Sequence, residues 1–305
     1  MLLAGCRSAP PELPPLRMGF DFWPGYYPAL VAQEARLFDS LGVRIELNLP
    51  QNTGSVLADF AAHRYDLVAA SVADMIPVLQ RELDARILFC TDESAGADAV
   101  VSPSLRTAGE LRGKWVGVKF GGFAELLVRR MLDSAGLALG DVYLVDVDAA
   151  DVPRELSAGR IDAGETWEPY LTDLRRKGHH ELFSSARVPG LIVECVFAHE
   201  DVVRTRRNEL VALTDAWFMA QSRLLADPPA SLSMVARAVG QPGASLSLAG
   251  VRFLDRDENR RRFTAEPGAK ALQTTVEDYE QFFGQLGSLR RRIDATRVIN
   301  AEFLR

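Results

Sequence analysis

Apolar and polar positions repeat along the chain in a pattern that predicts two copies of one structural unit. Residues 56–70 align with residues 152–166 at an offset of 96 positions, which pairs Asp66 with Asp162. In each copy, apolar residues at helical spacing end at a short polar turn, and the aspartate then opens a brief apolar run that is typical of a strand. A repeat of this kind indicates that the chain is built as two similar halves.

The same order of elements precedes both copies: an apolar run, a loop, an amphipathic helix and a second strand. In one of these helices Leu126, Leu127 and Met131 share a face, whereas Arg129 points outward. The expected elements are 16–20, 28–38 and 43–49 in the first half, and 114–118, 124–135 and 142–147 in the second. Strands that alternate with helices form a mainly parallel sheet. The sequence therefore predicts an α/β fold with two lobes of about one hundred residues each.

Two apolar, strand-like segments, 98–102 and 192–198, are expected to join the lobes and to form a hinge between them. On this basis lobe one comprises residues 17–100 and 196–305, and lobe two comprises residues 101–195. The C-terminal third is expected to return and cover lobe one with helices. These helices are expected near 209–227, 232–239 and 274–286.

Composition indicates a globular chain and excludes several classes of protein. The 305 residues include 48% hydrophobic and 25% charged side chains, which is typical of folded domains. The formal net charge of −6 leaves no excess of cations for a phosphate backbone, so nucleic acid is not expected as a partner. No run reaches the ~18 apolar residues that a membrane-spanning helix needs.

Three cysteines, Cys6, Cys90 and Cys195, are too few for a disulfide scaffold or a CxxC metal site. The segment Leu3-Ala4-Gly5-Cys6 resembles the lipobox of bacterial lipoproteins, which implies lipidation of Cys6 and a proline-rich tether over residues 1–16. A basic leader and a full apolar segment do not precede it, so we expect the true start codon further upstream. A chance apolar beginning is the alternative. Cys90 and Cys195 are expected to be buried thiols.

Loops after equivalent strands of the two lobes are expected to face one cleft, because ligands of open parallel sheets lie beyond the carboxyl ends of the strands. The first loop carries Trp23, Gly25 and Tyr26, in which aromatic rings stand beside a glycine that allows close approach to the backbone. The alternative is that these rings only fix a helix to the core. Gly121 and Gly122 precede a helix and offer backbone N–H groups to the anionic end of a ligand.

Acidic residues gather near the aromatic residues of these loops. They are Asp74, Asp92 and Asp98 in the first half, and Glu165 and Glu168 in the second. Carboxylates beside aromatic rings favour a cationic or amine-bearing group. A zwitterion would therefore satisfy both the acids and the glycine amides. The alternative is that the acids cap helices or pair with arginines.

Several motifs resemble the nitrate/sulfonate/taurine-type substrate-binding proteins of ABC transporters. They are Trp23-Pro24-Gly25-Tyr26-Tyr27-Pro28, Ser94-Ala95-Gly96-Ala97-Asp98, Leu111-Arg112-Gly113-Lys114-Trp115 and Thr166-Trp167-Glu168-Pro169. The resemblance implies a two-lobed type II periplasmic binding protein fold, which closes on a small polar, taurine- or sulfonate-like molecule and delivers it to an ABC permease. It also implies a monomer in the periplasm or at the cell surface, tethered to the membrane as a lipoprotein.

The resemblance places the ligand-binding residues on the loops described above. By position they are Trp23, Gly25, Tyr26, Ser71, Asp74, Asp92, Ser94, Phe120, Gly121, Gly122, Glu165, Trp167 and Glu168. The sequence contains no dinucleotide, P-loop or metal-ligand motif. Neither a cofactor nor a metal is therefore expected.

Enzymes of the same fold are the main alternative, because the resemblance extends to thiamine-pyrimidine synthases and menaquinone-pathway enzymes. The pyrimidine synthases carry a cysteine-rich run and a lysine for pyridoxal phosphate, and no CCCFG run occurs here. The four histidines complete no Ser/His/Asp or HExxH pattern. The sequence therefore favours a binding protein without catalytic residues. A ligand-sensing receptor that serves no transporter is the third candidate.

Overall fold

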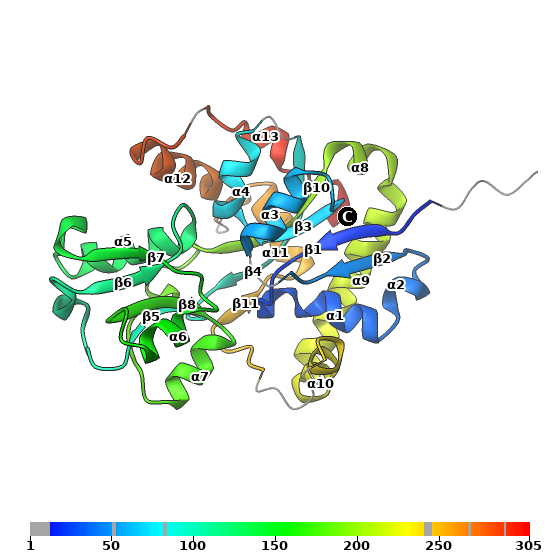
Figure 1. The fold of residues 1–305 in the computed structure, drawn as a ribbon. Helices are drawn as coiled ribbons and strands as arrows, with labels where there is room; N and C mark the ends of the chain where they lie inside the picture. The colour runs from blue at the N-terminus through cyan, green and yellow to red at the C-terminus, as the bar shows by residue number, and fades with distance from the viewer. Residues whose placement is uncertain (1–12, 51–52, 82–83, 241–245, 268–269, 290) are drawn as a thin grey trace, which may run out of the picture.

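The computed structural model describes residues 13–50, 53–81, 84–240, 246–267, 270–289 and 291–305. The predicted lipidation site, Cys6, lies outside these ranges. Within them, no helix has the length and apolar character needed to cross a membrane. Two β-sheets flanked by helices divide the described chain into two lobes (Figure 1).

The larger sheet defines lobe one and has six strands in the order β11-β4-β10-β3-β1-β2. Its strands are β1 (Leu16–Gly19), β2 (Ile45–Asn48), β3 (Leu67–Ser71), β4 (Ala85–Ser94), β10 (Val193–His199) and β11 (Val251–Phe253). Strand β1 pairs in parallel with β2 and β3, whereas β10 pairs antiparallel with β3 and β4, and β11 with β4. The strands predicted from the repeat are thus the parallel ones.

The smaller sheet defines lobe two and has five strands in the order β7-β6-β8-β5-β9. Its strands are β5 (Asp98–Ser102), β6 (Trp115–Val118), β7 (Tyr143–Asp146), β8 (Ala163–Trp167) and β9 (His180–Ser184). The arrangement β7-β6-β8 repeats the arrangement β2-β1-β3 of lobe one, and both sets are parallel. The predicted α/β fold with two sheets is confirmed.

Helices flank both sheets. In lobe one they are α1 (Tyr27–Glu34), α2 (Leu37–Ser40), α3 (Thr53–Ala61), α4 (Val72–Leu79), α8 (Glu200–Thr205), α9 (Arg207–Ala226), α10 (Pro228–Ala238), α11 (Arg256–Phe263), α12 (Leu272–Gln285) and α13 (Ala295–Val298). In lobe two they are α5 (Phe123–Ser134), α6 (Val152–Ser157) and α7 (Tyr170–Arg176). The single helix expected over 28–38 is divided into α1 and α2, because Arg36 between them adopts a left-handed conformation with φ 55°.

The C-terminal third packs on lobe one. Helices α9 and α10 contact α1, and α12 contacts α4. Trp217 of α9 is fully buried and its ring lies 5.3 Å from that of Phe89 on β4. Figure 1 shows this yellow-to-red part of the chain around the blue strands, with the C-terminus in the same lobe. These contacts hold lobe one together although lobe two interrupts its chain.

The chain passes twice between the two sheets. It leaves β4 at Ser94 and enters β5 at Asp98, then leaves β9 at Ser184 and returns to lobe one at Val193 of β10. The two segments expected as crossings, 98–102 and 192–198, therefore lie almost entirely within strands β5 and β10. Both segments are apolar enough to be buried in a sheet. Because β4 and β10 are neighbours in the larger sheet, the two connections leave lobe one side by side. The exact boundaries of the lobes, at residues 100/101 and 195/196, stay a prediction.

The side chain of Asn259 fastens α11 to strand β4. Its Oδ1 accepts the backbone N–H of Cys90 at 2.6 Å, and its Nδ2 donates to the backbone carbonyls of Cys90 at 2.8 Å and Asp255 at 2.9 Å. The side chain is fully buried. Since β11 pairs with β4 only along residues 92–94, Asn259 takes over the hydrogen bonds that a longer neighbouring strand would supply.

We expect Asn259→Ala to lower the free energy of unfolding by about 3 kcal/mol, because it leaves buried backbone groups of Cys90 without partners. Chemical denaturation measures this change. Gln273→Ala is the control, since that side chain is exposed and bonds to Glu277 on its own helix. Equal losses in the two variants would show that Asn259 does not fasten α11 to the sheet.

Candidate ligand-binding site

A small, partly open cavity lies between the lobes, beyond the carboxyl ends of β1, β3 and β8. Its volume is about 20 Å³, close to the space that one water molecule requires. We call this cavity the crease. The residues that line it are Asp21, Trp23, Tyr26, Ala70, Ser71, Asp74 and Glu194 from lobe one, and Asp98, Phe123 and Trp167 from lobe two. Both lobes therefore contribute to one site.

Trp23 lines the crease, and Asp92 lies beside the lining and holds the Trp23 ring. Nε1 of Trp23 donates to Oδ1 of Asp92 at 3.0 Å, and the hydroxyl of Thr91 donates to Oδ2 at 2.7 Å. Gly25 lies against this pair, where a Cβ would overlap the carboxylate of Asp92 and Nε1 of Trp23. The close approach of the first loop to β4 therefore accounts for the glycine.

Glu194 brings a further carboxylate into the crease from the middle of the larger sheet. It lies on β10, opposite Ser71 of β3 and Asp92 of β4. The hydroxyl of Tyr26 donates to its Oε2, and both side chains are buried. Sequence analysis missed Glu194, although a signal was present: it is the one charged residue in the apolar run 192–198.

Asp74 of lobe one reaches the N-terminus of α5 in lobe two. Its carboxylate lies near the backbone N–H of Phe123, which favours the charged form, and so close to Gly122 that a Cβ there would overlap Oδ1. The backbone N–H of Gly121 donates to Oε2 of Glu125 at 3.0 Å. Of the two amides expected to hold the anionic end of a ligand, that of Gly121 therefore binds a carboxylate of the protein itself.

Two carboxylates, one that lines the crease and one beside its lining, have almost no donor near them. Glu165 of β8 is fully buried, and neither of its oxygens has a hydrogen-bond partner among the described residues. Asp98 is equally buried, and the hydroxyl of Ser94 beside it already bonds to Ser185 at 2.7 Å and accepts the Asp98 amide at 3.2 Å. Because an unpaired buried carboxylate is costly, these two groups are the strongest candidates for contacts to a ligand.

Burial raises the pKa of five carboxyl groups, which we call the crease carboxylates: Asp74, Asp92, Asp98, Glu165 and Glu194. The pKa rises to about 7 for Asp74 and Asp92 and to about 8 for Asp98, mainly because burial disfavours the charged form. Burial, and then repulsion from Asp98 and Asp92 respectively, also raises the pKa of Glu165 and Glu194 well above the usual range. The cluster therefore favours the approach of any positive charge.

Glu93 and Glu168, which lie outside the crease, have arginine partners, whereas no basic residue is among the described residues that line the crease. Arg252 and Arg262 bond to Glu93 at 2.7 and 2.8 Å, and although burial opposes them, they hold its pKa below the usual range. Glu168 is buried and pairs with Arg175 at 3.1 Å. For Glu168 the arginine-pairing alternative is therefore the one observed.

Most of the residues predicted for the site surround the crease. Those that line it are Trp23, Tyr26, Ser71, Asp74 and Trp167, and those beside the lining are Gly25, Asp92 and Glu165. Ser94 and Glu168 bond instead to Ser185 and Arg175. The lining residues absent from the predicted set are Asp21, Ala70, Asp98, Phe123 and Glu194.

A second cavity, which we call the outer cavity, lies beside the crease and has a volume of about 270 Å³. It shares Asp74, Phe123 and Trp167 with the crease. The rings of Phe123 and Trp167 lie 5.7 Å apart and form a common apolar wall. The predicted residues Phe120, Gly121 and Gly122 belong to this outer cavity. A ligand group in the crease can therefore extend into it.

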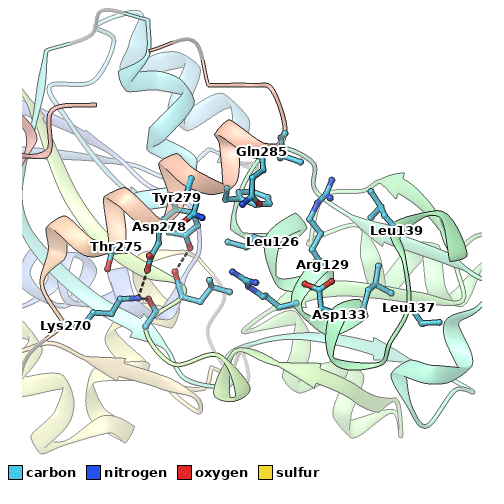
Figure 2. A pocket seen from close by; sticks show the side chains of 17 residues that line it. Leu126, Arg129, Asp133, Leu137, Leu139, Lys270, Thr275, Asp278, Tyr279 and Gln285 are labelled. Carbon is cyan, nitrogen blue, oxygen red and sulfur yellow. Dashed lines mark hydrogen bonds and ion pairs between the residues drawn. The ribbon is translucent and has the colours of Figure 1, made fainter. Parts of the chain in front are cut away.

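A larger cavity of about 510 Å³ lies between α5 and α12, and two of the charged side chains that line it form ion pairs (Figure 2). Its lining residue Lys270 pairs with Asp278 at 3.1 Å, and Arg129 pairs with Glu125 at 2.6 Å. These charges are already compensated, unlike the crease carboxylates. Across the described ranges, no group of three or more His, Cys, Asp or Glu side chains is arranged to hold a metal ion.

Residues 9–240, most of the sequence, match the NMT1-like family. The chain belongs to the NMT1-like family. The resemblance to substrate-binding proteins of the nitrate/sulfonate/taurine type is thereby confirmed, and solved structures agree with it.

Solved structures share the two-lobed fold of this NMT1-like protein. The alkanesulfonate-binding protein SsuA from Xanthomonas axonopodis, bound to MOPS, aligns with a TM-score of 0.74 and 17% identity over 95% of this chain and 99% of that chain. SsuA from Escherichia coli aligns with a TM-score of 0.74 and 16% identity over 96% and 100%. The desulfurization enzyme DSZB aligns with a TM-score of 0.67 and 18% identity over 95% and 97%. At such identities the likeness shows the fold alone, which binding proteins and an enzyme share.

Curated relatives of the NMT1-like protein match over shorter stretches. A protein of Brucella abortus (strain 2308) named as a binding protein is 23% identical over 181 residues, which is 58% of this chain and 52% of that protein. A protein of Haemophilus influenzae named as a thiamine biosynthesis protein is 28% identical over 148 residues, 46% of this chain and 45% of that protein. The chain spans about half the length of the curated relatives that it matches.

The raised pKa values predict that this NMT1-like protein loses stability as the pH rises from about 4 to about 8. Over that range the unfolded chain has already released the protons of Asp74, Asp92 and Asp98, whereas the folded protein retains them up to their pKa values of about 7 to 8. Replacing Glu165 by Gln removes one buried charge. We expect Glu165→Gln to raise the free energy of unfolding at pH 8 by about 1–3 kcal/mol.

Denaturant titrations of wild type and Glu165→Gln at pH 5 and at pH 8 measure this effect. Burial lowers the pKa of His199, which contributes in the opposite sense, so the difference between the two proteins isolates the crease. Glu46→Gln, at an exposed position on β2, is the control and should change nothing. A Glu165→Gln protein no more stable than wild type at pH 8 would mean that this carboxylate carries no burial cost.

Proposed function

We propose that this protein is the extracytoplasmic substrate-binding component of an ABC importer and that its ligand carries a protonated amine. The observation that carries the proposal is a cavity between two lobes, lined by Asp74, Asp98 and Glu194 and by no lysine or arginine among the described residues. A cation in the crease would compensate the crease carboxylates, and the lobes that enclose it would exclude water.

The same observation argues against a purely anionic ligand such as a sulfonate or nitrate. An anion in the crease would lie beside Asp74, Asp98 and Glu165, with no lining arginine or lysine to compensate them. The helix N-terminus that suits an anion is taken by Asp74. The ligand that this chain accepts therefore differs in charge from the alkanesulfonates named for the SsuA structures.

The sizes of the two cavities constrain the shape of the ligand. At about 20 Å³ the crease admits a group no larger than an ammonium head. The outer cavity of about 270 Å³, with its wall formed by Phe123 and Trp167, has room for an uncharged or aromatic body. Lys119 and Arg81 are among the residues that line this cavity, so the anionic end of a zwitterion would meet basic side chains there.

The transport role also rests on the family and on the division into two lobes. Adjacent strands β4 and β10 carry both connections, an arrangement that suits rotation of one lobe against the other. We propose that the closed form delivers the ligand to a membrane permease from the periplasm or the cell surface. Within this proposal the protein is a monomer, and lipidated Cys6 would tether it to the membrane.

An enzyme is the second candidate, and one observation favours it. Carboxyl groups with a pKa of about 7, as for Asp74 and Asp92, suit general acid–base catalysis, and an enzyme shares the fold. The described cysteines lie in the sheet beneath the crease and are fully buried, so neither is available as a nucleophile. An enzyme would convert a bound amine to product, whereas a receptor would release it unchanged.

Three probes with the same carbon chain test the charge of the ligand: propylamine, aminopropanesulfonate and propanesulfonate. At concentrations well above their dissociation constants, we expect the two amines to raise the thermal midpoint by about 5 °C, because binding to the folded state adds RT ln(1 + [L]/Kd). Propanesulfonate should give no shift. Stabilisation by propanesulfonate alone would refute the amine proposal, and mass spectrometry of the recovered probes distinguishes a receptor from an enzyme.

Binding should change tryptophan emission through Trp167, which lies on the wall between the crease and the outer cavity. We expect Trp167→Ala to lose most of this signal and to weaken amine binding by about tenfold or more, since it removes an aromatic wall beside a cation. Trp115→Ala is the matched control, because Trp115 is 49% exposed and stacks only on Tyr143 at the outer edge of lobe two. Equal affinity in the two variants would remove Trp167 from the site.

A further inference from the structure

Cys90 and Cys195 face each other across two neighbouring strands of lobe one. They are opposite one another where β4 and β10 pair antiparallel, next to a β-bulge between Glu194 and Cys195, and their Sγ atoms lie 3.0 Å apart. Both side chains are fully buried as free thiols. Opposed residues of an antiparallel pair have Cα atoms about 4.5–5.5 Å apart, which lies within the range of roughly 4.4–6.8 Å that a disulfide spans.

Asn259 decides which kind of cross-strand pair these cysteines form. The backbone N–H and carbonyl of Cys90 both bond to the Asn259 side chain on α11, at 2.6 and 2.8 Å. They therefore do not bond to Cys195. In an antiparallel ladder such a non-hydrogen-bonded pair is the one with the shorter Cα separation and the closer side chains. The fold thus holds the two sulfur atoms in the register that a direct bond requires.

We propose that Cys90 and Cys195 form a structural disulfide in the exported protein. The oxidant is a disulfide, either a small one such as glutathione disulfide or that of a thiol-oxidising protein. One cysteine thiolate attacks it and forms a mixed disulfide, and the second cysteine then displaces the remaining thiol. The two cysteines lose two protons and two electrons, and the oxidant is reduced to two thiols. Only the supply of oxidant in an extracytoplasmic compartment rests on the proposed function.

Because both thiols are buried in the folded protein, we expect the disulfide to form before or during folding. Burial raises the pKa of Cys195 well above its ordinary value, and the nearby Cys90 thiol adds to the effect, so the folded protein presents almost no reactive thiolate at Cys195. Neither sulfur is exposed to an external oxidant. We therefore expect the folded, reduced protein to resist oxidation that the refolding chain undergoes readily.

The position of the pair gives the bond a structural role at the hinge. Cys90 lies in the last half of β4, just before the chain leaves for lobe two, and Cys195 lies near the start of β10, just after it returns. The two residues are 105 positions apart, and the whole of lobe two lies between them. A bond here joins the points where the chain leaves and re-enters lobe one, and it leaves β5 and β9 free to move with lobe two.

The test is to refold reduced full-length protein from denaturant with glutathione disulfide and to measure its intact mass after alkylation. We expect loss of two hydrogens, no alkylation of Cys90 or Cys195, and one cross-linked peptide that contains both. Protein exposed to the same oxidant in the folded, reduced state should keep both thiols. A reductant added during thermal unfolding should lower the midpoint of the oxidised protein by about 10 °C, because the bond closes a long loop.

Two variants complete the experiment. Cys6→Ala should form the same bond, whereas Cys195→Ala should show neither the loss of two hydrogens nor the effect of reductant on the midpoint. A refolded wild type in which both Cys90 and Cys195 are alkylated would overturn the proposal, as would a cross-link to Cys6. Amine binding is measured on the same samples. Amine binding without the disulfide would contradict only this inference, and the disulfide without amine binding would contradict only the proposed function.

Discussion

The burial of like charges between the two lobes is the constraint on which the rest of the site depends. The crease carboxylates come from α4, β4, β5, β8 and β10, so closing the lobes brings together groups that repel one another. Two unit charges about 4 Å apart at a protein surface interact by about 4 kcal/mol, and burial increases the effect. Closure at neutral pH therefore requires protons or a cation in the crease. The same requirement couples ligand binding, pH and lobe closure.

This constraint also explains why family and ligand are separate questions for this chain. The fold is shared with alkanesulfonate-binding proteins and with a desulfurization enzyme, and the sequence identities are between 16% and 18%. Two sheets joined by adjacent strands provide a closing cleft whatever the cleft contains. Charge in the cleft is decided by a few side chains, such as Asp98 and Glu165, which can change without altering the strands that carry them.

Much of the fold could be predicted because the apolar pattern is repeated. The pairing of Asp66 with Asp162 locates β3 and β8, and the shared order β2-β1-β3 and β7-β6-β8 follows from it. The places of the antiparallel strands β5 and β10 in the sheets were harder to predict, because an apolar run has the same pattern in a connection between lobes and in a sheet. The break between α1 and α2 at Arg36 depends on a left-handed backbone conformation that the residue pattern did not predict.

The site was predictable where a loop follows a strand, and less so elsewhere. Trp23, Tyr26 and Asp74 follow the ends of strands, where ligands of such sheets are found. Glu194 is inside a strand, and its role depends on which neighbours that strand acquires in space. Sequence could not separate Glu168 from Glu165 either, because the difference lies in Arg175, which folds back to one of them.

The contact between Asp74 and the first turn of α5 has a consequence for the free protein. Asp74 belongs to lobe one and α5 to lobe two, so any outward swing of the lobes strips the helix of a carboxylate and exposes the Phe123 amide to water. Opening therefore carries an energetic penalty of its own before any ligand is considered. Part of the preference for the shut conformation is encoded in the polypeptide, and the captured molecule has only to supply the remainder.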